Sequence, residues 1–112
     1  AELGRLAEAR ATFQALLALD PTSAVGHNGL GAIALLEHKP EEARHHYQDA
    51  LAHHPNDLAS RQSLAMLYET VWQNPGEALR LCEDVRRMAP RTPDIDACIE
   101  RNRARLADPR PR

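Results

Sequence analysis

The chain has 112 residues, of which 43% are hydrophobic and 27% charged, a composition typical of one soluble globular domain. Its net charge of −2 argues against general nucleic-acid binding, and no apolar run is long enough to cross a membrane. We therefore expect a soluble protein, cytoplasmic or periplasmic, without membrane insertion. Because the chain begins at Ala1 and not at Met, we expect it to be a piece of a longer protein, so the missing signal peptide says nothing about its compartment.

Apolar residues spaced three and four apart predict six helices in chain order. The predicted ranges are 5–19, 24–37, 40–53, 58–72, 76–88 and 93–107. We interpret residues 1–3 as the end of a preceding helix and residues 108–112 as a disordered tail. No segment alternates with a period of two, so we expect no sheet.

The helix predicted over residues 24–37 contains three glycines, Gly26, Gly29 and Gly31. Each glycine costs a helix about 1 kcal/mol relative to Ala. We therefore predict that the backbone of this helix packs closely against a neighbour. Thr22 or Ser23 is expected to cap its start.

One short motif occurs three times along the chain. Each copy has Glu-Ala, then Phe, Tyr or Cys four residues after the Ala, and Pro 12 residues after the Ala. The copies are Glu8-Ala9…Phe13…Pro21, Glu42-Ala43…Tyr47…Pro55 and Glu77-Ala78…Cys82…Pro90. Their prolines are 34 and 35 residues apart, a period typical of stacked helical hairpins.

The period and the residues together resemble the tetratricopeptide repeat (TPR) family. Its first helix carries Trp, a Leu-Gly pair and Tyr, and its second helix carries Ala, an aromatic residue and a closing Pro. In residues 24–57 the matching positions are Leu30, Gly31, Ala43, Tyr47 and Pro55. His27 stands where the family has Trp, and Ala34 where it has Tyr.

A second stretch, residues 58–91, resembles the same pattern. It matches through Leu64, Ala65, Tyr68, Ala78, Cys82 and Pro90, whereas Arg61 replaces the Trp. Residues 1–22 match only the second half of a unit, through Ala9, Phe13 and Pro21.

The resemblance implies an all-α fold, a right-handed solenoid of antiparallel helical hairpins (a TPR-like α–α superhelix) with a C-terminal capping helix. One domain would cover residues 1–107. It would comprise a partial repeat at 1–22, repeats at 24–57 and 58–91, and the capping helix at 93–107. Small Ala and Gly residues would lie where helices touch, and Phe13, Tyr47 and Cys82 would fill the spaces between hairpins.

In TPR domains the first helices of successive hairpins line a concave groove that binds a peptide or helix of a partner. The resemblance thus implies a protein–protein interaction module within a larger bacterial scaffold or secretion and assembly protein. Carried over by position, the groove would be lined by Val25, Asn28, Ala32, Leu35, Leu36, Gln62, Met66, Glu69 and Thr70. These residues form apolar patches with two amides that could hold a peptide backbone. They lack the cationic set by which some TPR domains clamp a chaperone's C-terminal carboxylate.

Self-association is the alternative function. Phe13, Leu16 and Leu17 would face the place of a missing first helix, and an exposed apolar stripe favours association with a second copy. A weaker third interpretation is a non-catalytic domain of a larger enzyme. No P-loop, dinucleotide fingerprint, CxxC or HExxH motif occurs, so we predict no catalytic residues, no enzymatic activity and no cofactor.

The histidines of the chain raise the hypothesis of a metal-binding site. His45, Asp49 and His53 lie four residues apart on one predicted helix, a spacing at which a His and a carboxylate can share a metal. A zinc site needs three or four converging ligands, however. His45, His46, His53 and His54 fall mostly on the side away from Tyr47 and Ala50. We interpret them as a solvated face and predict no metal site. His27 is interpreted as a partly buried packing residue.

Cys82 and Cys98 lie on the inward sides of neighbouring predicted helices. We favour two buried free thiols that pack as small hydrophobic residues. A disulfide is the alternative, and it needs Cα atoms within about 7 Å of each other.

Arginines are concentrated near the C-terminus and could bind phosphate or an acidic surface. They are Arg101, Arg103, Arg105, Arg110 and Arg112. Acidic residues alternate with them, so we favour a solvated capping helix and tail.

Overall fold

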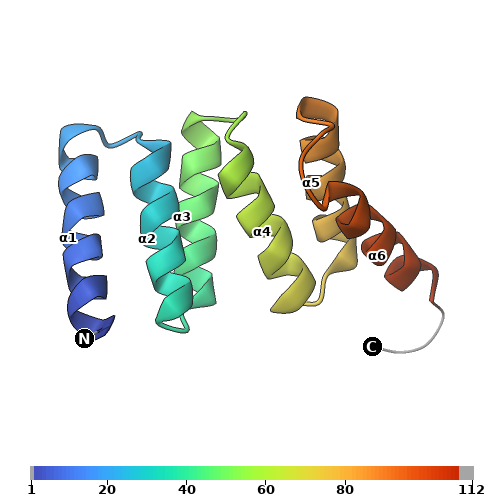
Figure 1. Ribbon diagram of the computed structural model, residues 1–112, viewed down its shortest axis with the longest axis horizontal. Coiled ribbons are helices and arrows are strands. Elements are labelled where there is room, and N and C mark those ends of the chain that lie inside the picture. Colours follow the sequence, from blue (N-terminus) through green and yellow to red (C-terminus); the bar gives the residue numbers. More distant parts are fainter. Residues whose placement is uncertain (1, 109–112) are drawn as a thin grey trace. The chain divides into compact units, whose positions relative to one another are not determined.

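The computed structural model describes residues 2–108, which form six α-helices and no strand (Figure 1). The helices are α1 (Glu2–Leu19), α2 (Ala24–Leu36), α3 (Pro40–His53), α4 (Leu58–Thr70), α5 (Pro75–Met88) and α6 (Ile95–Ala107). The all-α prediction is therefore confirmed for this part of the chain. None of these helices is long and apolar enough to span a membrane. The expectations for Ala1 and for residues 109–112 of the tail lie outside the described residues.

Helix boundaries differ from the prediction by up to three residues. α1 begins at Glu2, so a separate preceding helix over residues 2–3 is wrong. α4 ends at Thr70 and not at residue 72, because the Trp72 N–H bonds to the Leu67 carbonyl, five residues back, and the α pattern stops. α6 begins two residues late because Asp94 has a φ of 62°, outside the helical region.

The chain divides into two compact units, residues 1–60 and residues 61–112. The first unit contains α1, α2 and α3, and the second contains α5 and α6. α4 begins in the first unit and continues in the second.

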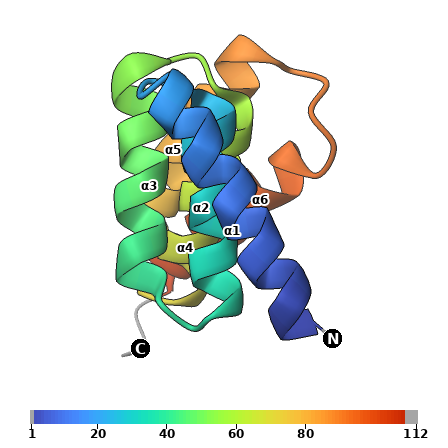
Figure 2. The ribbon, with the colours of Figure 1, turned by 90° about the vertical axis from the view of Figure 1, so that its left-hand side faces the viewer.

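In the first unit, α2 packs against both α1 and α3 (Figure 2). The start of α2 is capped by Ser23, whose Oγ accepts a hydrogen bond of 3.1 Å from the Gly26 N–H. α3 begins with Pro40, which tolerates this position because its missing N–H would have no helical partner.

The glycines of α2 lie directly against large side chains of its two neighbours. A Cβ atom at Gly29 would come within 2.4 Å of the Phe13 ring, and one at Gly31 within 2.6 Å of the Tyr47 ring. At Gly26 the nearest atoms belong to Leu17, at 2.8 Å. The prediction of close backbone packing is confirmed, because no larger residue fits these places without displacing a side chain.

The second unit is built around the contact between α5 and α6. Its buried apolar residues on these helices are Ala78, Leu81, Cys82, Val85, Ile95, Cys98 and Ile99. Met88 and Leu106 lie outside this core and are 40% and 49% exposed. Both lie in the last turn of their helices.

Candidate functional site

The nine predicted groove residues fall on α2 and α4, and therefore on both units. We consider the residues of each unit as a separate surface. The α2 surface is defined as Val25, Asn28, Ala32 and Leu36. Leu35, the fifth predicted residue of α2, is half-buried.

Two large apolar side chains of the α2 surface are open to solvent. Val25 and Leu36 are each 65% exposed, and Ala32 is exposed as well. Apolar side chains that gather on an exposed helix face are a common mark of an interaction site.

A pocket of about 250 Å³ adjoins Val25 in the first unit. Its lining residues are Phe13, Ala24, Val25, Asn28, Gly29, Asp57 and Ala59. The pocket offers an aromatic ring, aliphatic carbons, one amide and one carboxylate to a ligand. It could therefore accept an apolar side chain while Asp57 contacts a polar or basic group beside it.

Asn28 and Asp57 are linked through Ser60. The Asn28 Nδ2 donates to the Ser60 Oγ at 3.0 Å, and the Ser60 hydroxyl donates to the Asp57 carboxylate. Ser60 is fully buried, so this chain of bonds fixes the polar side of the pocket. The sequence analysis did not select Asp57 or Ser60 as site residues, because Asn28 and Ser60 are 32 residues apart and such a pair leaves no local pattern.

The second surface lies on α4 and its neighbours in the second unit. A pocket of about 170 Å³ is lined by Gln62, Ala65, Met66, Glu69, Cys82, Pro93, Asp94, Ile95, Cys98 and Arg101. Met66 is 48% exposed. Thr70 donates its hydroxyl to the Met66 carbonyl at 2.7 Å, so this predicted groove residue uses its polar group within α4.

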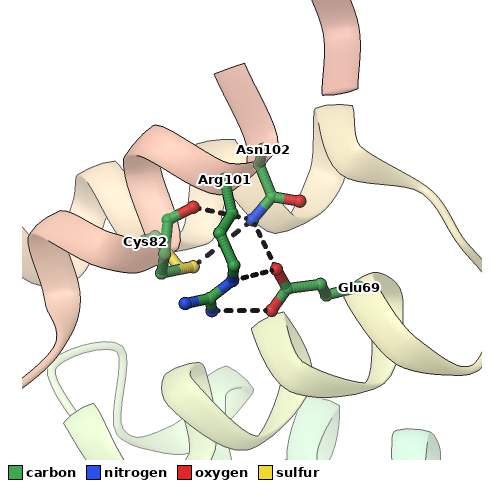
Figure 3. Close-up of a disulfide and its surroundings, with 5 residues drawn as sticks. Glu69, Cys82, Arg101 and Asn102 are labelled. Atoms are coloured by element: carbon green, nitrogen blue, oxygen red, sulfur yellow. Dashed lines mark hydrogen bonds and ion pairs between the residues drawn. A yellow bond between two sulfur atoms is a disulfide. The ribbon is translucent and has the colours of Figure 1, made fainter. Parts of the chain in front are cut away.

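The Glu69 carboxylate holds α6 (Figure 3). It accepts bonds from Arg101 Nε at 2.8 Å, Arg101 Nη2 at 3.0 Å and Asn102 Nδ2 at 3.3 Å. These donors lower the pKa of Glu69, the Arg101 hydrogen bond most strongly, although burial acts in the opposite direction. Arg105 also donates to the Glu69 carbonyl oxygen at 3.3 Å. Glu69 therefore serves chiefly as an anchor for α6.

Cys82 and Cys98 form a disulfide with a Cα–Cα distance of 6.4 Å (Figure 3). The favoured interpretation as two free thiols is wrong, and the alternative is correct. Both cysteines lie on the inward sides of neighbouring helices, so their sulfur atoms come together. Helical spacing alone cannot distinguish two packed thiols from a disulfide.

Histidines do not converge on a metal site in the described part of the chain, where no group of three or more His, Cys, Asp or Glu residues could hold one. His27 and His46 instead lie against each other, with ring centroids 5.9 Å apart. His27 is partly buried, as predicted, and its Nε2 lies 3.0 Å from the Pro21 carbonyl oxygen. His46 is half-buried and not part of a fully solvated face, which corrects that prediction for this residue.

Acid is expected to destabilise the first unit through His46. Burial lowers the pKa of His46, the neighbouring His27 and His45 lower it further, and Asp49 and Glu42 oppose this shift. The unfolded chain therefore binds a proton more readily than the folded protein. The stability contributed by neutral His46 is complete above the unfolded pKa of about 6.5 and is lost as the pH falls below it.

Urea unfolding followed by circular dichroism at pH 7.5 and pH 5.5 tests this expectation. The protein should lose more stability between the two pH values than its His46→Gln variant. Equal losses in the two proteins would contradict it.

The side chains predicted for self-association already have neighbours in the first unit. Phe13 contacts Gly29, and Leu17 contacts Gly26, so both face α2 and not an empty position. Leu16 is half-buried. Self-association through these residues remains a prediction, although the premise for Phe13 and Leu17 is wrong.

Arginines of α6 are engaged in ion pairs and hydrogen bonds. Arg101 pairs with Glu69, and Arg103 pairs with Glu83 at 3.0 Å. Arg110 and Arg112 lie outside the described residues.

Comparison with family models finds no match to the chain, and comparison with curated proteins finds none.

Proposed function

We propose that the protein is a TPR-like protein–protein interaction module that binds a segment of a partner on the α2 surface. The support is the repeat period of 34 and 35 residues, together with helices whose small residues meet large ones. Gly31 and Tyr47, which match the family's Leu-Gly and aromatic positions, are in contact. The stacked, right-handed solenoid of hairpins and a place within a larger scaffold are parts of the same proposal.

The pocket beside Val25 is the observation that carries this function. It opens next to an apolar side chain that is 65% exposed, and the Asn28–Ser60–Asp57 chain fixes its polar side. A preformed pocket with a few placed polar groups suits the anchoring side chain of a peptide.

Charge indicates which kind of segment would bind. Residues 1–60 contain four Lys or Arg and eight Asp or Glu, a net charge of −4, and Asp57 lies in the pocket itself. We therefore propose a partner segment with an apolar anchor flanked by Lys or Arg. The apolar group would enter the pocket near Val25, and Leu36 would contact the same segment further along α2.

A selection from phage-displayed random dodecapeptides tests the proposal. Selected peptides should be enriched in large apolar residues with Lys or Arg nearby, and their affinity should fall as salt is added. Fluorescence polarisation with a synthetic copy of a selected peptide then measures Kd for single variants. Val25→Asp and Leu36→Asp should each weaken binding by about 10-fold or more, the loss expected for a central contact.

Leu19→Asp is the matched control, because Leu19 is 87% exposed in the same unit and lines no part of the pocket. Its affinity should equal that of the unchanged protein. Selected peptides without apolar anchors, or equal losses in all three variants, would overturn the proposal.

A further inference from the structure

The α5–α6 contact differs in one respect from the α1–α2 contact. In the first unit the Phe13 ring packs on Gly29, which follows it by 16 residues. In the second unit Cys82 occupies the same motif position as Phe13, and its disulfide partner Cys98 also follows by 16 residues. The second unit therefore has a disulfide at the motif position where the first unit has a contact between an aromatic ring and a glycine.

Besides the disulfide, α6 is joined to α5 by their shared apolar core, and the polar contacts printed between the two helices are weak. The ion pairs Arg86–Asp96 and Arg103–Glu83 have exposed arginines and contribute little. α6 follows Asp94, which has left-handed backbone geometry and makes no side-chain capping bond. If the disulfide were broken, two small thiols would remain where the first unit has a phenyl ring.

The surroundings of the disulfide suit its reduced form as well. Asn102 Nδ2 lies 3.5 Å from the Cys98 Sγ, and Asn102 Oδ1 is buried and has no hydrogen-bond partner within residues 2–108. Reduction creates an S–H donor beside this amide. Both cysteines also line the second pocket, whose other residues include Pro93, Ile95 and Arg101 from α6 and the segment before it.

We propose that the Cys82–Cys98 disulfide is a reversible redox clasp that fixes α6 on α5 and so completes the wall of the second pocket. In the reduced protein, α6 keeps its contacts with Glu69 but loses the covalent attachment to α5. It therefore detaches more often, and the pocket loses one side. This inference concerns the second unit and does not depend on the function proposed for the α2 surface.

A dithiol is the class of reductant that the clasp requires. One of its thiolates attacks the Sγ of Cys98, the more exposed of the two residues at 8% against 3%, and the Cys82–Cys98 bond breaks. The electron pair of that bond stays on the Cys82 sulfur, which takes up a proton. The second thiolate of the reductant then attacks the reductant sulfur that is bonded to Cys98. The reductant leaves as a disulfide, and Cys98 is released as a thiolate that takes up the second proton.

Amide hydrogen exchange of the oxidised and dithiothreitol-reduced protein tests the clasp. Amides of α6 should exchange about 100-fold faster after reduction, the effect expected from opening a loop of this length. Amides of α1, α2 and α3 should be unchanged and serve as the internal control. Unchanged exchange in α6, or equal acceleration in all helices, would overturn the proposal.

Two variants separate the bond from a general loss of folding. Cys98→Ala should exchange like the reduced protein whether or not reductant is present. The double variant Cys82→Phe, Cys98→Gly copies the Phe13–Gly29 pair and should keep α6 protected in both conditions. If reductant still accelerated α6 exchange in either variant, the effect would not come from this disulfide and the clasp would be refuted.

Discussion

Replacing Gly31 with Val is expected to reduce the free energy of unfolding by about 2–3 kcal/mol. The first added carbon already lies 2.6 Å from the Tyr47 ring, and Tyr47 is only 2% exposed, so the ring has little room to move. The better helix propensity of Val recovers only part of this cost. Urea unfolding followed by circular dichroism measures the difference.

The control is Gly4→Val, because Gly4 in α1 is exposed and no atom of the described residues lies within 4 Å of a Cβ placed there. This variant should be as stable as the unchanged protein or slightly more stable. The Gly31→Val substitution should also cost less when Tyr47 is first changed to Leu, since the two residues then no longer collide. Additive losses in the double variant would show that Tyr47 is not the obstacle.

Replacing Glu69 with Ala is expected to cost about 2 kcal/mol, because one carboxylate accepts three hydrogen bonds from Arg101 and Asn102. Asn102 is fully buried and would lose a partner. Glu77→Ala is the matched control: Glu77 pairs with Arg80 on the surface, so its replacement should cost less than about 0.5 kcal/mol. Chemical unfolding at pH 7 compares the two variants, and equal losses would contradict the anchoring role of Glu69.

The same carboxylate adds acid sensitivity to the second unit. Because the pKa of Glu69 is lowered in the folded state, its contribution is complete above the unfolded pKa of about 4.3. The contribution is lost as the pH falls through the folded pKa. Glu69→Gln should therefore unfold with a weaker dependence on pH below about 4.5 than the unchanged protein.

Local patterns were sufficient to predict the helices of residues 2–108 and the close packing of α2. Periodicity and turn residues gave all six helices, and the cost of three glycines in α2 indicated close packing, which the contacts of Gly29 and Gly31 confirm. Local patterns could not predict that Phe13 faces α2, because helical spacing marks an apolar side without saying what covers it.

Contacts between residues far apart in the chain could not be predicted from the sequence alone. Glu69 and Arg101 are 32 residues apart, and a charged residue on a helix usually faces solvent. The disulfide had a usable signal, since Cys82 and Cys98 repeat the 16-residue spacing of Phe13 and Gly29. That signal becomes meaningful only once the Phe13–Gly29 contact is known.

Nuclear magnetic resonance of the ¹⁵N-labelled protein, titrated with a synthetic copy of a selected basic and apolar peptide, tests the central claim most directly. Binding on the α2 surface should shift the amide signals of Val25, Asn28, Gly29 and Leu36, and Val25→Asp should remove these shifts. Shifts confined to α5 and α6, or shifts in α2 that persist unchanged in Val25→Asp, would contradict the assignment of the binding surface to α2.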